Sequence, residues 1–137
     1  GSFNISSIAT LEEPLLVKMP LAFVALLLVL PIKLKKSPFD VAEAHQEITG
    51  GAEIEYSGIF YEFLYTAKWL DYIFAYALVY LFVSSNIFLA ITVLILTFLL
   101  VNAVDNSTAR VDYKQMLKFT FWTALPAALI NLLWVTL

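Results

Sequence analysis

The chain has 137 residues, of which 61% are hydrophobic and only 14% are charged; its net charge is −3 and it has no cysteine. A soluble domain carries about a quarter charged residues, so this apolar excess needs lipid as its solvent. The negative charge argues against nucleic-acid binding, which needs clustered cations. The lack of cysteine excludes a cysteine-ligated iron–sulfur or zinc site within this chain.

Four apolar stretches predict an all-α, multi-pass transmembrane bundle that forms a single membrane domain. They cover residues 15–32, 59–83, 87–104 and 119–137. A bilayer core needs about 20 helical residues, so the last two stretches fit, the first is short, and the first turns of the second should extend beyond the hydrocarbon. These stretches are too long for strands and lack the alternation of a β-barrel.

Basic residues mark one side of the predicted bundle. They follow the first and third helices, in loops 33–57 and 105–118, whereas Lys18 lies near the opposite side and Lys68 within the second helix. Cytoplasmic loops carry an excess of lysine and arginine, so both loops are expected in the cytoplasm and both chain ends outside. The six loop cations are Lys33, Lys35, Lys36, Arg110, Lys114 and Lys118.

The first of these loops is acidic and is predicted to contain a short helix. Ser37 can cap it, Pro38 suits its first position, and the glycines at 50 and 51 end it. At 3.6 residues per turn, three carboxylates share one helix face and should raise one another's pKa, which allows protons to be shared. They are Asp40, Glu43 and Glu47.

Further acids continue this row into the second helix, because Glu55 precedes it and Glu62 and Asp71 lie within it. Acids inside a spanning segment are costly and usually functional, which favours a proton or cation relay. The alternative is a solvated loop helix with lysine counter-charges, an interfacial Glu62, and an ion pair of Asp71 with Lys68 at i, i+3. Both interpretations stay open at this point.

Three polar or kinking residues lie in otherwise apolar helices. Asn102 and Asn131 are expected to hydrogen-bond between helices. Pro126 is expected to kink the last helix.

The loop motif resembles a known family. Residues 37–47, followed by 55–58, resemble the two-part signature of the subunit 1 (H subunit) family of respiratory complex I. The same family supplies the membrane anchor of energy-converting [NiFe] hydrogenases. Three further segments are similar to it: residues 1–5, residues 110–116, and Pro126 with Asn131.

The resemblance implies about eight membrane helices in the family, of which this chain matches roughly the second half. The opening residues, without an initiator methionine, agree with a chain entered partway. The remaining half of the same subunit, or a companion chain, is then an expected partner. Lys33, Lys35 and Lys36, where complex I members have an acid, are more similar to the hydrogenase branch and its ferredoxin-linked, sulfane-reducing relatives.

By resemblance, the chain is a non-redox membrane subunit with no catalytic centre, metal or cofactor of its own. Iron–sulfur clusters, and in the hydrogenase branch a [NiFe] centre, belong to peripheral hydrophilic subunits, and antiporter-like subunits lie beside it in the cell (inner) membrane. It would anchor the peripheral arm and couple redox chemistry to proton or sodium translocation. Alternatives are a quinone-site subunit of an NADH-quinone oxidoreductase and a purely structural anchor.

Two groups of residues are expected to carry this role. The expected relay consists of Asp40, Glu43, Glu47, Glu55, Glu62 and Asp71. The expected contacts of the peripheral arm are Phe39, His45, Lys35, Lys36 and Arg110.

Overall fold

The computed structural model describes residues 14–39 and 55–136, and this part of the chain is helical without any strand. Its elements are α2 (Leu15–Lys18), α3 (Pro20–Lys33), α4 (Ile59–Phe82), α5 (Ile87–Ser107), α6 (Tyr113–Phe119), the π-helical turn η2 (Thr120–Ala124) and α7 (Leu125–Thr136). Two helical stretches, Ile87–Ser107 and Tyr113–Thr136, are long and apolar enough to cross a bilayer, and Pro20–Lys33 is a shorter apolar helix. The all-α membrane fold is therefore confirmed.

Proline divides the first predicted helix in two. Met19, between α2 and α3, has φ −133° and ψ 59°, and Pro20 is the first residue of α3. A residue that precedes proline is driven out of the helical region, whereas proline itself suits a helix start because it has no N–H to satisfy. The sequence 15–32 therefore forms a short turn followed by the main helix.

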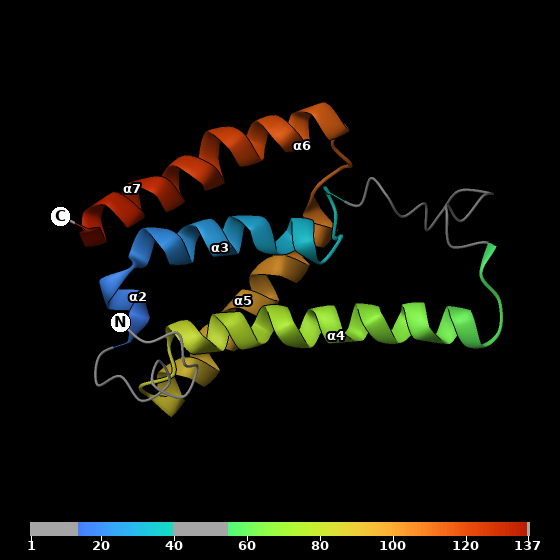
Figure 1. The fold of residues 1–137 in the computed structure, drawn as a ribbon, viewed down its shortest axis with the longest axis horizontal. Coiled ribbons are helices and arrows are strands. Elements are labelled where there is room, and N and C mark those ends of the chain that lie inside the picture. Colours follow the sequence, from blue (N-terminus) through green and yellow to red (C-terminus); the bar gives the residue numbers. More distant parts are fainter. Residues whose placement is uncertain (1–13, 40–54, 137) are drawn as a thin grey trace.

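Helix α3 lies at the centre and contacts α4, α5 and α7. Helices that follow one another along the chain (α3, α4, α5, and then α6 with α7) run in opposite directions (Figure 1). The buried core joins side chains of α3 and the residue after it, of α4 and of α5. These are Phe23, Leu30, Leu34, Ala75, Val79 and Val101.

Helix α4 reaches past the ends of α3 and α5 at its beginning (Figure 1), as its length predicts. Glu62 lies in this first part. On α5 and the last helical stretch, large apolar side chains face outward; Phe88, Trp122 and Trp134 are 80%, 81% and 78% exposed. Apolar surface on this scale needs lipid or further membrane helices as a neighbour.

The last helical stretch begins at Tyr113, earlier than expected, and contains a π turn before Pro126. Here the N–H of Leu125 donates to the carbonyl of Thr120, five residues earlier. Proline has no N–H for the usual partner four residues before it, and a π turn is one way for a helix to absorb that loss. The structure thus has a π turn directly before Pro126; the predicted kink stays a prediction.

Asn131 links α7 to the start of α3, as predicted. Its Oδ1 accepts hydrogen bonds from the N–H groups of Leu21 (3.0 Å) and Ala22 (3.2 Å), and its side chain is buried. The residue before α3 provides no side-chain cap, so Asn131 satisfies two donors that a helix start leaves open. The amide Nδ2 of Asn102 instead donates to Phe98 of its own helix, 2.8 Å away.

The loop helix predicted from Pro38 is only partly within the described residues. Residues 37–39 form a turn, so no helix begins at Pro38. The remainder of that prediction, residues 40–54, lies outside the described part of the chain.

Candidate functional site

The end of α3 directs the chain toward α5. The N–H of Lys36 donates to the carbonyl of Pro31 (2.9 Å), the N–H of Lys35 donates to Ile32 (3.2 Å), and Lys35 has φ 50°. This is the hydrogen-bond pattern of a Schellman helix end, whose left-handed residue is usually glycine. The reversal brings Lys36 and Ser37 next to the C-terminal part of α5.

The two basic loops meet at this end of the bundle. The N–H of Ser37 donates to Asp105 Oδ1 (2.9 Å), and Ser37 Oγ donates to the carbonyl of Thr108 (2.9 Å). The N–H of Val111 donates to the carbonyl of Pro38 (3.0 Å). The prediction that both loops lie on the same side of the bundle is confirmed; that this side is the cytoplasm stays a prediction.

Asp105 also pairs with Lys36. Lys36 Nζ lies 3.0 Å from Asp105 Oδ2, and their side chains are 30% and 25% exposed. Both carboxylate oxygens of Asp105 thus accept a hydrogen bond, one from an ammonium group and one from the backbone. The hydrogen bond to Asp105 is the main cause that raises the pKa of Lys36 above 10.5; burial opposes it, and Tyr72 adds to it.

A second ion pair joins α3 to α4. Lys33 Nζ lies 2.8 Å from Asp71 Oδ1, with about half of each side chain exposed (48% and 49%). Asp71 is therefore engaged across helices, which the i, i+3 alternative did not predict. Exposed pairs of this kind contribute about 0–1 kcal/mol, so the pair adds little to the stability of the bundle.

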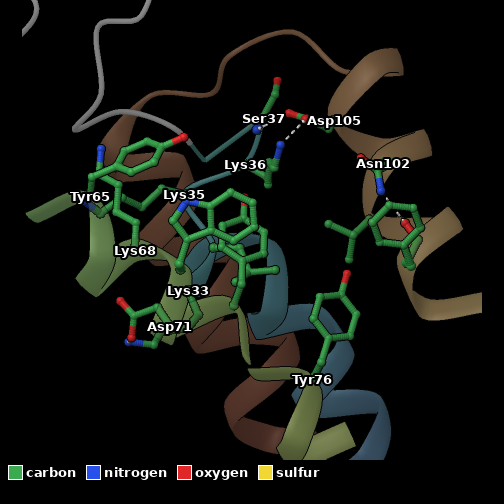
Figure 2. A pocket seen from close by; sticks show the side chains of 15 residues that line it. Lys33, Lys35, Lys36, Ser37, Tyr65, Lys68, Asp71, Tyr76, Asn102 and Asp105 are labelled. Carbon is green, nitrogen blue, oxygen red and sulfur yellow. Dashed lines mark hydrogen bonds and ion pairs between the residues drawn. The ribbon is translucent and has the colours of Figure 1, made fainter. Parts of the chain in front are cut away.

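A cavity of about 560 Å³ opens beside these two ion pairs, between the end of α3, the middle of α4 and the C-terminal half of α5. Figure 2 shows the charged residues of the three elements around it and the contacts of Asp105 with Lys36 and Ser37. The charged residues that line it are Lys33, Lys35, Lys36, Lys68, Asp71 and Asp105.

The other predicted site residues lie apart from this cavity or outside the described residues. Glu55 and Glu62 are exposed, as is Arg110. The ring of Phe39 packs against Phe119 in a tilted arrangement, with centroids 5.6 Å apart. The predicted relay and docking residues that fall outside the described part of the chain are Asp40, Glu43, His45 and Glu47.

Sequence reasoning missed Asp105. Asp105 directly follows the uncharged stretch 87–104 and begins the loop 105–118. The sequence already predicts this loop on the same side of the bundle as the lysines at 33–36, and that was the available signal. Ser37 was assigned to a helix cap, but its hydroxyl donates to Thr108 instead. Among the described residues no group of three histidine, cysteine or acidic side chains is arranged to hold a metal ion.

The sequence model of the family described as NADH dehydrogenase matches residues 1–136 of this chain. The chain belongs to this family. The resemblance to the complex I subunit 1 (H subunit) family is thereby confirmed.

Curated members of the family are longer than this chain. The chain is similar to the H subunit of NADH-quinone oxidoreductase from Methylococcus capsulatus, with 32% identity over 146 residues, 96% of this chain and 45% of that protein. The corresponding protein of Anoxybacillus flavithermus is 28% identical over 148 residues, 96% of this chain and 44% of that protein. The chain thus spans less than half the length of these relatives. No solved structure matches it.

Proposed function

We propose that this NADH dehydrogenase family chain is a membrane subunit of a complex I-like oxidoreductase. It holds the peripheral electron-transfer arm on the cell (inner) membrane and couples redox chemistry to the translocation of protons or sodium ions. The observation that carries the proposal is the Lys36–Asp105 pair, with Ser37 on the same carboxylate, where two loops and three helices meet. The names of the relatives and the family match support the same assignment.

The geometry suggests how charge at this end can affect the bundle. Lys36 is bound to Asp105, and both side chains are partly buried. Removing one partner of a partly buried ion pair leaves the other charge without its partner, which destabilises the contact. Protonation of the Asp105 carboxylate would therefore weaken the contact between the end of α3 and α5. An interface with two stable arrangements can convert such a local change into a movement of helices.

The acidic loop supplies the other part of the proposal. Asp40, Glu43, Glu47 and Glu55 act as a charge relay that leads to Asp71, which is already held by Lys33. His45, Lys35, Lys36 and Arg110 contribute to docking of the peripheral arm. Phe39 contributes less to that contact, since it already packs against Phe119.

The partners are proposed from the same family. The peripheral arm contains hydrogenase-like large and iron–sulfur subunits, which hold the iron–sulfur clusters and, in the hydrogenase branch, a [NiFe] centre. Antiporter-like subunits and the remaining half of the subunit, or a companion chain, lie beside this chain in the lipid. The lysines at 33, 35 and 36 favour the hydrogenase branch, because they lie in the stretch where complex I members usually carry an acid just before the loop.

A quinone-site role is the second candidate, and the cavity favours it. Its volume of about 560 Å³ is within the range of small-molecule sites, and aromatic side chains line it together with polar groups. The relatives, whose names describe an NADH-quinone oxidoreductase, agree with this candidate. Inhibition of electron transfer by quinone analogues in the purified complex distinguishes it from the hydrogenase type.

The test of the coupling proposal is the double substitution Glu43→Gln and Glu47→Gln in the assembled complex, with electron transfer and ion pumping measured separately. We expect pumping to fall while electron transfer continues. The matched control is Glu12→Gln with Glu13→Gln, two acids near the opposite end of the first predicted helix. If the first pair leaves both activities at wild-type levels in an assembled complex, the relay is refuted; if it prevents assembly alone, the structural anchor is the better account.

A further inference from the structure

The last helical stretch begins with an outward face that is both basic and apolar. Five exposed side chains of this face recur at intervals of three and four residues, which is the spacing of neighbours on one side of a helix. They are Lys114, Leu117, Lys118, Phe121 and Trp122. The coupling role uses none of these five residues.

Contacts with the end of α3 give the depth of this face. Phe119 packs against Phe39, and the N–H of Val111 donates to the carbonyl of Pro38, so the start of α6 lies beside the residues that follow α3. The apolar helices α3 and α5 both become charged at this level. Spanning helices carry such charges where the hydrocarbon ends. The two lysines of the face therefore lie at headgroup depth, and its two aromatic rings lie about one turn deeper.

The lysine pair of this face is not neutralised by the described part of the chain. Within that part, neither Lys114 nor Lys118 forms an ion pair, whereas two other lysines at the same end of the bundle do. Asp112 is two residues before Lys114, a spacing at which side chains do not face each other on a helix. Two like charges four residues apart repel each other, with about 5–6 Å between their Cβ atoms. An anion between the two ammonium groups removes this repulsion.

The surface below the lysines is apolar over the length of an acyl chain. Large exposed side chains continue from Phe121 to Trp134. At 1.5 Å per residue this distance is about 20 Å, which exceeds half of the bilayer core of about 30 Å. Soluble phosphate would leave this apolar surface uncovered, and another helix would need an acid at the same depth, which is costly in a spanning segment. A lipid with an acidic headgroup satisfies both parts of the face.

We propose that this outward face binds an acidic phospholipid, with its phosphate between Lys114 and Lys118 and an acyl chain against Phe121 and Trp122. The proposal is independent of the coupling role, because it needs only the last helical stretch and a membrane. A bound lipid neutralises the lysine pair and covers the two exposed aromatic rings, and so it fixes the depth of this helix in the bilayer.

Trp122 is a built-in probe of this site, and Trp134 is its matched control. They are 81% and 78% exposed on the same helical stretch, but only Trp122 lies next to the lysines. Trp69→Phe with Trp134→Phe leaves Trp122 as the sole tryptophan, and Trp69→Phe with Trp122→Phe leaves Trp134. Each full chain is placed singly in nanodiscs of phosphatidylcholine. Phosphatidylglycerol or phosphatidylcholine, brominated on the upper part of the acyl chain, is then added at equal mole fraction to quench the fluorescence.

The two probes should respond differently to the two lipids. We expect phosphatidylglycerol to quench Trp122 several-fold more strongly than phosphatidylcholine does, and both lipids to quench Trp134 equally. Equal quenching of Trp122 by the two lipids overturns the proposal. A preference of the same size at both tryptophans overturns it as well, because phosphatidylglycerol would then be attracted to the protein as a whole.

The lysines are tested in the chain that keeps Trp122. A lysine near an anionic surface contributes about a fivefold preference, so Lys114→Gln with Lys118→Gln should remove most of the preference for phosphatidylglycerol. The matched control, Lys114→Arg with Lys118→Arg, should keep it. A preference that survives in the glutamine pair, or that is lost in the arginine pair, contradicts the proposal.

Further measurements separate the lipid from other occupants and keep the test decisive. If the glutamine pair does not fold, rising salt must lower the preference in the chain with its native lysines, and an unchanged preference overturns the proposal. Inorganic phosphate is the soluble competitor. If it lowers the preference more than chloride does at equal ionic strength, the lysines bind soluble phosphate and the lipid proposal fails. If neither lipid quenches Trp122, protein covers this face, and the proposal is equally wrong.

Discussion

Lys36 and Asp105 are 69 residues apart in the sequence and form a partly buried ion pair, with 3.0 Å between Nζ and Oδ2. The same carboxylate accepts the N–H of Ser37. The Asp105 side chain thus holds the residues after α3 against the end of α5. In the proposed coupling, a change in charge at this end of the bundle would act on the packing of the helices through this contact.

Replacing Asp105 by asparagine should destabilise this junction. The amide can still accept from Ser37 but leaves Lys36 without its counter-charge, so we expect a loss of about 1–3 kcal/mol. Thermal unfolding of the protein in detergent measures it. The control is Asp112→Asn, an exposed residue whose side chain makes no capping hydrogen bond. Equal stability of the two variants would contradict the role given to Asp105.

Stability should also depend on pH through Lys36. The folded state raises the pKa of Lys36 above 10.5, mainly through the hydrogen bond to Asp105, so the folded protein holds this proton more tightly than the unfolded chain. The resulting stabilisation is complete below about pH 10.5 and is lost as the pH rises through the folded pKa. Unfolding temperatures of wild type and Lys36→Met, measured from about pH 8 upward, should differ by a constant amount and then converge. If the difference between the two unfolding temperatures grows at alkaline pH, the pKa of Lys36 is lowered by folding and the account is contradicted.

Asn131 should be the more sensitive of the two asparagines within apolar helices. Asn131→Leu leaves the N–H groups of Leu21 and Ala22 without their acceptor at the start of α3, which should cost about 1–3 kcal/mol. Asn102→Leu removes only a bond to the carbonyl of Phe98 within the same helix, so a much smaller change is expected. Hydrogen exchange at the first turn of α3 should accelerate in the first variant alone.

The turn at Lys35 can be improved. Lys35 has φ 50°, a left-handed conformation that costs a side chain energy and glycine almost none. Lys35→Gly should therefore raise stability by up to about 1 kcal/mol, whereas the β-branched Lys35→Val should lower it. A gain for valine in denaturation experiments would exclude the helix end described here.

Much of the fold could be predicted from the sequence, because long uncharged stretches have few alternatives to spanning helices. The break at Met19 and Pro20 was less visible, since a proline near a helix start is compatible with continuation or restart. The site was harder to predict. The charges at the end of α3 were recognised, yet their partners on α4 and α5 depend on how the helices pack, and Asp105 was read as an ordinary loop residue.

The sequence was most informative where residue type and spacing act locally. Asn131 predicted an interhelical bond, which is present. Pro126 predicted a kink, and the structure has a π turn directly before it. Ser37 and Pro38 are also typical of a helix start, but Asp105 and Thr108 offer Ser37 competing acceptors from a distant segment. Tertiary hydrogen bonds of this kind cannot be derived from local spacing.

The most direct test of coupling is the number of ions translocated per electron pair when Asp71 is replaced by asparagine in the assembled complex. The half-exposed Lys33–Asp71 pair adds little to stability, so the variant should assemble. Ion uptake and electron transfer are measured together in proteoliposomes. Our account predicts a clear fall in the number of ions translocated per electron pair. The rate of uncoupled electron transfer should stay within about twofold of wild type, and a twofold change corresponds to about 0.4 kcal/mol in the activation barrier. An unchanged ratio in an assembled, active complex would contradict it.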